Sequence, residues 1–167
     1  MKNSFNSFSI VTPLGNFTAM YTENGLAGLN FPNGKPHHTA NGNAAGEKAP
    51  AKIREWHRAT ETALKKSLAG KDSGELPPLD LEGTEFQKSV WRELLKISSG
   101  KTKSYGEIAR AIGNPKAVRA VGGACGANPV PVLVPCHRVL AANKKIGGFS
   151  GGLDWKRKLL AQEGIVL

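Results

Sequence analysis

A cysteine, a histidine and an arginine follow one another directly at Cys136, His137 and Arg138. The thiolate is the reactive form of cysteine, and neighbouring cations or hydrogen-bond donors lower the pKa of a thiol from about 8.5. The sequence therefore favours Cys136 as a nucleophile in an environment that its two neighbours activate. Cys125 lacks such neighbours and is expected to be a small apolar residue of the core.

The contact between Cys136 and His137 raises a geometric question. Because successive side chains of a strand point to opposite sides, a hydrogen bond between these two requires a local bend or a bridging water. A carboxylate is also expected to orient the histidine. The second half of the chain offers four acidic residues for this role, and their spacing does not choose among them: Glu93, Glu107, Asp154 and Glu163.

The sequence indicates neither a metal site nor a nucleotide cofactor. Structural zinc sites are typically marked by Cys-x-x-Cys or His-x-x-x-His pairs, and the chain has none. His37 and His38 fall in a predicted loop, and His57 is expected at the polar edge of a helix. The Gly-rich run 147–152 fits neither a phosphate-binding loop nor a dinucleotide fingerprint. We therefore expect no metal and no cofactor.

The positive charge of the chain is concentrated in its second half. The formal charge is +10, and residues 81–167 hold 14 of the 23 Lys and Arg but only 6 of the 13 Asp and Glu. Clustered basic side chains gain free energy by releasing counterions from phosphates, which points to a polyanion such as a nucleic acid. A basic protein without such a partner has the same composition, so the charge alone decides nothing.

The composition excludes a fully disordered chain and a membrane-spanning one. With 40% hydrophobic and 22% charged residues, the chain has enough apolar side chains for a core. No apolar run approaches the roughly 18–20 residues of a membrane span, and the N-terminus lacks the apolar segment of a secretory signal. Two cysteines form at most one disulfide. We expect a cytoplasmic protein with reduced thiols and no membrane partner.

Residues 1–80 are predicted to form an N-terminal domain with a small antiparallel sheet. Runs rich in strand-forming residues lie at 8–12, 17–22 and 26–31. Turn residues separate these runs, which is typical of a three-stranded meander. Residues 32–50 are rich in Pro, Gly, Asn and Ala and are predicted to be a flexible surface loop. Apolar residues at helical spacing predict a helix over 51–68.

Residues 81–167 are predicted to form a mostly helical domain. Thr84 with Gln87 fits the capping box of a helix N-terminus, and so does Ser104 with Glu107. Each pair precedes a run of apolar residues at helical spacing. We therefore expect one helix to begin after each of the two caps.

A third helix over 116–126, with Pro115 at its first position, is predicted to be the recognition element of a helix-turn-helix. Its side chains are almost all small, and each interior Gly costs roughly 1 kcal/mol relative to Ala. Either a close approach to another surface or tight packing between helices explains such a segment. Arg119 is its long side chain and is suited to contact a phosphate or to enter a groove.

Four segments of the chain resemble the O6-alkylguanine-DNA alkyltransferases, also called methylated-DNA–protein-cysteine methyltransferases. They are Asn114–Gly122, Gly126–Pro129, Pro135–Val139 and Phe149–Gly152. The match runs in consecutive order over about residues 84–164. It implies an α+β fold in which a small N-terminal antiparallel sheet with a helix, ribonuclease H-like, precedes a mostly helical, winged-helix-like helix-turn-helix domain that carries the catalytic residues. The two domains are expected at 1–80 and 81–167.

The resemblance also implies roles for the residues around the thiol. Cys136 would be the nucleophile that takes the alkyl group. His137 would deprotonate it through a water, and Glu163 would orient the histidine. Asn128 would brace the site from the end of the recognition helix.

For DNA, the resemblance implies two further groups of residues. Arg119 would enter the base stack in place of the extruded base, and Tyr105 would press on the neighbouring phosphate. The remaining DNA-binding residues would be Lys116, Ala120 and Gly122. The pocket for the flipped base would be lined by Val139, Gly147, Gly148 and Ser150.

The implied reaction is a direct repair of DNA that consumes one protein for each lesion. The alkyl group moves from O6 of guanine, or from O4 of thymine as a second candidate, to Cys136 after the base is flipped out. The resulting thioether does not hydrolyse. The implied partner is double-stranded DNA containing O6-alkylguanine, and the protein is expected to be a monomer without an obligate protein partner.

The chain departs from the family pattern at a few positions. Phe149 stands where many members have Tyr, so a hydroxyl contact to the base or its pocket is expected to be missing. Gly106 also lacks the polar side chain that other members have. Two other functions fit part of the sequence. A DNA binder without enzymatic activity leaves the Pro135–Val139 segment unused, and a cysteine hydrolase leaves Arg119 unexplained.

Overall fold

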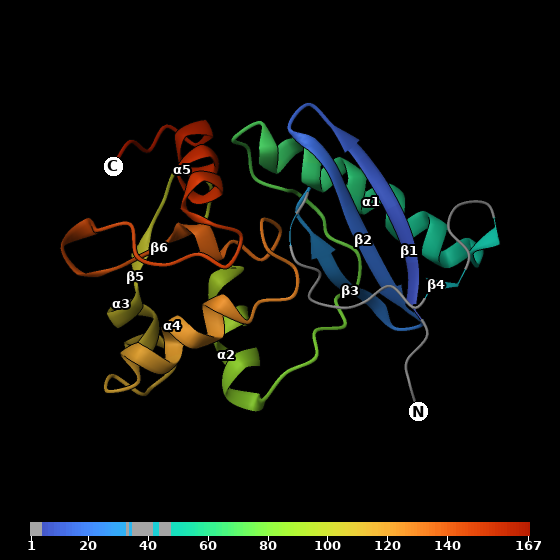
Figure 1. The fold of residues 1–167 in the computed structure, drawn as a ribbon. Helices are drawn as coiled ribbons and strands as arrows, with labels where there is room; N and C mark the ends of the chain where they lie inside the picture. The colour runs from blue at the N-terminus through green and yellow to red at the C-terminus, as the bar shows by residue number, and fades with distance from the viewer. Residues whose placement is uncertain (1–4, 33, 35–41, 44–47) are drawn as a thin grey trace.

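The N-terminal half is built on a small sheet whose first three strands follow one another along the chain (Figure 1). The computed structural model describes residues 5–32, 34, 42–43 and 48–167. β1 (Phe5–Thr12) pairs antiparallel with β2 (Gly15–Thr22), which pairs in the same way with β3 (Gly25–Asn30). The predicted meander is confirmed, and each strand starts earlier than expected.

A fourth strand, β4 (Gly42–Asn43), pairs parallel with the start of β1. It lies within 32–50, where the sequence predicted only a loop, so that prediction is wrong at these two residues. A pairing this short depends on backbone groups and leaves no side-chain pattern to detect. His37 and His38 lie outside the described residues.

α1 (Ala51–Leu68) lies along one face of the sheet and has the predicted bounds (Figure 1). Its apolar residues fall on one side of the helix because they recur at helical spacing, and that side is buried in the core. The buried apolar residues are Ile53, Ala63, Leu64 and Leu68. Burial of this stripe fixes the helix on the sheet.

His57 of α1 faces the sheet and not the polar edge of the helix, so that prediction is wrong. Its ring stacks on Phe8, with 4.2 Å between the ring centroids. Its Nδ1 atom lies 2.9 Å from the Tyr21 hydroxyl oxygen. An imidazole presents an apolar ring face as well as polar nitrogens, so it packs on an aromatic ring and keeps a hydrogen bond.

The C-terminal half is mostly helical, and with the sheet it confirms an α+β fold. The helices are α2 (Glu85–Leu94), α3 (Tyr105–Ala111), α4 (Val118–Gly126) and α5 (Leu153–Gln162). Two short strands, β5 (Lys103–Ser104) and β6 (Val139–Leu140), pair in parallel. This pair brings the start of α3 next to the segment that follows Cys136.

Both predicted capping boxes are present. At the start of α2, Gln87 N–H donates to the Thr84 hydroxyl at 3.1 Å, and the Gln87 side-chain oxygen accepts from Thr84 N–H at 2.9 Å. Ser104 and Glu107 make the equivalent pair at the start of α3, at 3.0 and 2.7 Å. Each box satisfies two backbone N–H donors that the start of the helix leaves free, with side-chain oxygens as the acceptors.

α4 starts two residues later than predicted, at Val118. Ala117 N–H donates to the Asn114 carbonyl at 3.0 Å, so Pro115 lies in the turn before the helix. The fixed φ of proline suits the second position of a turn as well as the first position of a helix. The helix packs on α2, where the Trp91 indole N–H donates to the Ala124 carbonyl at 2.8 Å.

One buried apolar cluster extends from the sheet into the C-terminal helices. A backbone hydrogen bond also joins the halves, since Leu29 N–H donates to the Pro129 carbonyl at 2.9 Å. Among the described residues, no helix is long and apolar enough to cross a membrane.

Candidate active site

Cys136 lies in a short 3-10 turn, Cys136–Arg138, between the apolar stretch after α4 and β6. Its N–H donates to the Val134 carbonyl at 2.8 Å, and the residue is only 3% exposed. In this turn, successive side chains do not point to opposite sides as they do in a strand. The turn is therefore the local bend that the sequence analysis required if Cys136 and His137 belong to one site. The sequence alone does not show this bend because the flanking residues are apolar and β-branched.

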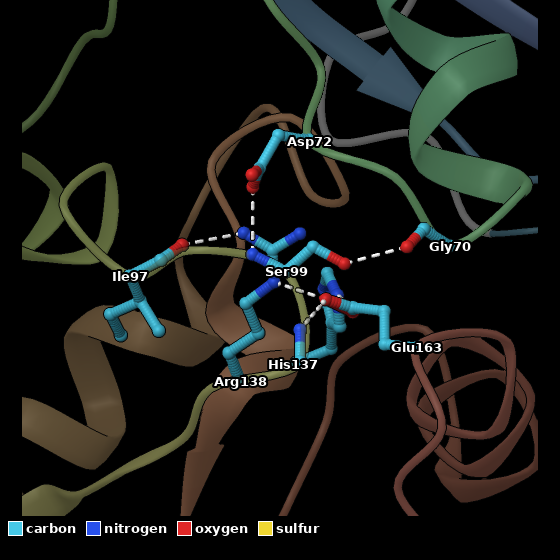
Figure 2. Close-up of polar contacts among 8 residues, drawn as sticks. Gly70, Asp72, Ile97, Ser99, His137, Arg138 and Glu163 are labelled. Atoms are coloured by element: carbon cyan, nitrogen blue, oxygen red, sulfur yellow. Dashed lines mark hydrogen bonds and ion pairs between the residues drawn. The ribbon is translucent and has the colours of Figure 1, made fainter.

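His137 and Arg138 converge on the Glu163 carboxylate (Figure 2). His137 Nε2 lies 2.8 Å from Glu163 Oε2, and Arg138 Nε donates to Oε1 at 2.6 Å. Glu163 follows α5 directly as its C-terminal cap. The side chains of His137 and Glu163 are 2% and 1% exposed, so water does not screen this contact.

The other acidic candidates lie elsewhere. Glu93 pairs with Lys96 at 2.6 Å on the surface of α2. Glu107 belongs to the cap of α3, and Asp154 is exposed in the first turn of α5. Among the four carboxylates that the sequence offered, Glu163 is the one that contacts His137.

Hydrogen bonds near Glu163 also hold the segment before α3, residues 97–99, and the link between the two halves of the chain (Figure 2). Arg138 donates to the Ile97 carbonyl at 2.6 Å. Ser99 donates from its hydroxyl to the Gly70 carbonyl at 2.6 Å and from its N–H to Asp72 at 2.7 Å. At Gly70 the backbone φ is +81°, and an added Cβ would lie 1.9 Å from the Gln162 carbonyl oxygen. The link therefore lies directly against the end of α5.

The buried His137 ring is neutral at pH 7. Burial lowers its pKa below the ordinary 6.5, and the hydrogen bond to Glu163 opposes this only in part. Burial by itself would raise the pKa of Glu163, but its bonds to His137 and Arg138 outweigh burial and hold the pKa below its ordinary value. An ionised carboxylate only accepts hydrogen bonds, so Nε2 carries the proton. Nδ1 then holds a lone pair, and within the described chain it has no hydrogen-bond partner.

Burial raises the pKa of the Cys136 thiol to about 11. The Asn128 side chain, the Lys156 ammonium and two backbone N–H groups act in the opposite direction without overcoming it. The expectation that this pKa lies below its ordinary value is therefore wrong: the His137 backbone N–H does lower it, but the His137 imidazole is neutral, the Arg138 guanidinium is bound to Glu163, and burial outweighs the rest. The resting thiol is protonated and requires a base before it reacts.

Asn128 holds the stretch that leads to Cys136. Its side-chain N–H donates to the Val134 carbonyl at 2.7 Å, and its side-chain oxygen accepts from Val130 N–H at 3.0 Å. The residue is fully buried. It ties the end of α4 to the turn before the thiol, in the position that the sequence comparison implied.

Lys156 of α5 is a site residue that sequence reasoning missed. The residue is fully buried, and its ammonium donates to the Val139 carbonyl at 2.7 Å and the Gly148 carbonyl at 3.0 Å. Burial lowers its pKa to about 8. The sequence does contain a sign of this burial. Lys156 stands three residues before Leu159 and four before Leu160, so it lies on the apolar face of the same helix.

Three of the predicted base-pocket residues lie next to Tyr105 or Lys156. Gly147 has a φ of +70°, and an added Cβ would lie 2.9 Å from the Tyr105 hydroxyl, so only glycine fits there. The carbonyls of Val139 and Gly148 both accept hydrogen bonds from the Lys156 ammonium. Ser150 is exposed in the turn before α5.

The glycines of α4 have no packing partner within the described chain. An added Cβ at Gly123 would meet nothing within 4 Å, and one at Gly122 would only touch the Tyr105 ring at 4.0 Å. Tight internal packing therefore does not explain them. Arg119 and Ala120 are exposed on the same helix, and Lys116 is exposed just before it. This leaves a smooth helix face with one long basic side chain open to another molecule.

A groove of about 620 Å³ adjoins the start of α3. It lies beside β5 and β6, next to the element that carries Tyr105. Basic side chains predominate in its lining: Lys101, Lys103, Arg110 and Lys144, with Glu107 as the acidic member. The groove therefore offers a positively charged surface beside α3.

Known proteins are similar to this chain in sequence and in fold. The family model described as the DNA-binding domain of 6-O-methylguanine DNA methyltransferase matches residues 85–165. A methylated-DNA–protein-cysteine methyltransferase from Methanosarcina acetivorans is 42% identical over 153 residues, which are 92% of this chain and 94% of the relative. One from Mycolicibacterium paratuberculosis is 59% identical over 85 residues, 51% of this chain and 52% of that protein.

A solved structure is similar over nearly the whole chain. The crystal structure of Mycobacterium tuberculosis OGT in complex with DNA has a TM-score of 0.76 and 36% identity, and the match covers 95% of this chain and 93% of that one. The identity to the Methanosarcina protein, at almost full length of both sequences, is high enough to assign a family. The chain belongs to the methylated-DNA–protein-cysteine methyltransferase family.

Proposed function

We propose that this protein repairs double-stranded DNA by moving the alkyl group of O6-alkylguanine onto Sγ of Cys136. The observation that carries the proposal is a buried, protonated thiol beside a neutral histidine that Glu163 holds. A nucleophile, a base and a residue that orients the base are the parts required for activation of a thiol. The same site acts on O4-alkylthymine if the smaller base reaches the thiol.

In the first step, His137 accepts the thiol proton, through a bridging water as the family resemblance implies. The lone pair on Nδ1 is free for this because Nε2 donates to Glu163. The thiolate then attacks the alkyl carbon, so that a carbon–sulfur bond forms as the carbon–O6 bond breaks. The electron pair of the broken bond stays on the purine, which takes up the proton, and the net products are guanine and S-alkylcysteine.

The thioether has no good leaving group, so each chain acts once. No step requires a cofactor or a metal ion. Asn128 keeps the turn with Cys136 in place, and the backbone N–H groups around the sulfur favour its anionic form.

We infer that DNA lies across α4 and the start of α3. The alkyl group within a duplex is out of reach of a buried thiol, so the nucleotide must be extruded at a cost of a few kcal/mol. Arg119 fills the space in the stack, Tyr105 contacts the adjacent phosphate, and the bare face at Ala120 and Gly122 allows close approach to the minor groove. Lys116 and the basic groove contact phosphates along the backbone.

The flipped base enters the space bordered by Val139, Gly147, Gly148 and Ser150. Phe149, in the same loop, offers no hydroxyl to the base. The pocket therefore recognises guanine chiefly through backbone groups of this loop and through its shape.

We also infer that residues 1–80 and 81–167 form two domains, the first ribonuclease H-like and the second winged-helix-like. We further infer that the protein acts as a cytoplasmic monomer.

The test is an intact-protein mass spectrum after the protein is mixed with duplex DNA that carries O6-methylguanine. We expect one added methyl group per chain, mapped to Cys136, in the parent and in Cys125→Ala, and none in Cys136→Ala. Binding without a mass change would instead identify a lesion sensor. Repeated turnover by one chain would overturn the single-use reaction and favour a hydrolase.

A further inference from the structure

Phe31, which directly follows β3, reaches from the N-terminal half to the loop beside Cys136. Its ring meets the Phe149 ring edge-on, with 5.7 Å between centroids and 79° between planes. It also contacts Trp155 of α5 at 4.9 Å and Phe17 of β2 at 5.5 Å. One aromatic side chain therefore joins the sheet, the loop 147–152 and α5.

The loop 147–152 lies directly against the Phe31 ring. An added Cβ at Gly151 would come within 2.7 Å of a Phe31 ring carbon and 3.0 Å of a Phe149 ring carbon. Real Cβ atoms do not approach this closely, so the backbone at Gly151 lies against both rings. A movement of the loop toward the sheet is blocked by the ring of Phe31.

The other end of the same loop contacts Tyr105 and Lys156, and Lys156 links it to the reactive thiol. Gly147 lies against Tyr105, and Gly148 accepts a hydrogen bond from Lys156, which is close enough to Cys136 to affect its pKa. The loop contains four glycines, and added Cβ atoms at Gly148 and Gly152 would meet nothing within 4 Å. Few side chains of its own hold it, so external contacts set its position.

We propose that Phe31 is a specificity-determining positioning residue. By bracing Phe149 and Gly151 it limits how far the loop moves away from Cys136, and so it limits the size of the alkyl group that the site admits. This proposal rests on the proposed function, since it assumes that the loop is one wall of the base pocket. It gives the N-terminal half a part in substrate selection.

The experiment compares single-turnover alkylation of Cys136 by duplex O6-methylguanine and by free O6-benzylguanine. Phe31→Leu removes the ring but keeps an apolar side chain. We expect the ratio of the benzyl rate to the methyl rate to rise about three- to tenfold, the effect of losing one or two aromatic contacts. Phe31→Tyr retains the ring and should keep the parent ratio.

Phe8→Leu is the matched control. Phe8 belongs to the same sheet but packs on Tyr21 and His57, away from the loop. Phe8→Leu should lower the melting temperature without changing the ratio of the benzyl rate to the methyl rate. Phe31→Met, whose flexible side chain adapts to the space left by the ring, replaces Phe31→Leu if that variant does not fold, and it should also raise the ratio.

Two outcomes have different meanings. If the parent protein is alkylated but Phe31→Leu lowers both rates equally, Phe31 only supports the fold and the proposal is overturned. If the parent protein is not alkylated by either compound, the proposed function itself fails. The parent measurement therefore separates the two failures.

Discussion

The Nε2 atom of His137 lies 2.8 Å from one oxygen of Glu163, while the other oxygen accepts from Arg138 at 2.6 Å. The carboxylate thus fixes the tautomer of the histidine and balances a buried guanidinium at the same time. Removing its charge affects both partners, because an unpaired buried charge is strongly destabilising.

Glu163→Gln is expected to slow alkylation of Cys136 by about two to four orders of magnitude, the usual range for losing a positioned base. The neutral amide no longer holds the proton on Nε2. Stability should also fall, since Arg138 loses its counter-ion. Glu93→Gln, which alters a half-buried carboxylate paired with the exposed Lys96, is the control. Single-turnover rates and melting curves measure both effects, and a normal rate in Glu163→Gln would exclude Glu163 as the orienting group.

The rate of alkylation is expected to depend on the protonation of His137. Its pKa is lowered by burial, so the imidazole is already neutral at pH 7 and the rate should be flat above that pH. Below the depressed pKa, the rate should fall about tenfold per pH unit as the lone pair is lost. A rate that instead rises steadily toward pH 11 would mean that solvent, and not His137, deprotonates the thiol.

The free energy of unfolding is also expected to fall at acidic pH, because the pKa of His137 is lower in the folded protein than in the unfolded chain. An unfolded histidine with the ordinary pKa binds a proton that the folded ring excludes, so the free energy of unfolding falls as the pH drops below about 6.5. Burial also lowers the pKa of His57, which adds to the effect. Urea midpoints at pH 5.5 and 7.5 should differ, and His57→Phe should remove only part of the difference.

Lys156→Met is expected to slow alkylation about 10- to 100-fold, as losses of supporting hydrogen bonds around a reactive group do. The buried Val139 carbonyl loses its donor, which costs about 1–3 kcal/mol for a buried unsatisfied group, and the exposed Gly148 carbonyl loses the bond that holds its loop. Lys158→Met is the matched control, because Lys158 is exposed on the same helix. Equal rates in the two variants would show that the Lys156 ammonium does not support the site.

Arg119→Ala is expected to slow repair of duplex DNA by at least tenfold, since an extruded base is no longer replaced in the stack. Reaction with free O6-benzylguanine should be unchanged. Arg92→Ala on the exposed side of α2 controls for lost charge. If the rates with both substrates fall equally, Arg119 stabilises the fold and does not act in base extrusion.

Gly123→Ala is expected to separate stability from DNA binding. The added methyl group meets nothing within 4 Å among the described residues, and alanine favours a helix over glycine by up to about 1 kcal/mol. The melting temperature should rise while the dissociation constant for DNA increases, because the methyl group occupies the space between α4 and the minor groove. Unchanged DNA affinity would argue against this face as the contact surface.

Local patterns in the sequence predict the three longer strands and the longer helices, but not the two-residue strands β4, β5 and β6 or the contacts between elements. The caps at Thr84 and Ser104 were predictable because a capping box involves residues three apart. The bounds of α1 followed from a single apolar stripe. The start of α4 was misplaced because Pro115 is equally suited to a turn and to a first helical position.

The site required tertiary information. Glu163 lies 26 residues beyond His137, and no local rule distinguishes it from the three other carboxylates. The resting pKa of Cys136 was misjudged because its neighbours in sequence are cationic types, whereas burial and the partners of those neighbours decide the outcome. Lys156 was overlooked because a lysine on an apolar helix face is usually solvated at its tip.

The contact of Gly70 with the end of α5 has a practical consequence for protein engineering. The chain at Gly70 leaves no room for a side chain, since a Cβ there would collide with the end of α5 next to Glu163. A split or labelled form of the protein should therefore not be cut or extended there. Gly74 and Glu75, a few residues later, are exposed and are the better place to insert a reporter or a cleavage sequence.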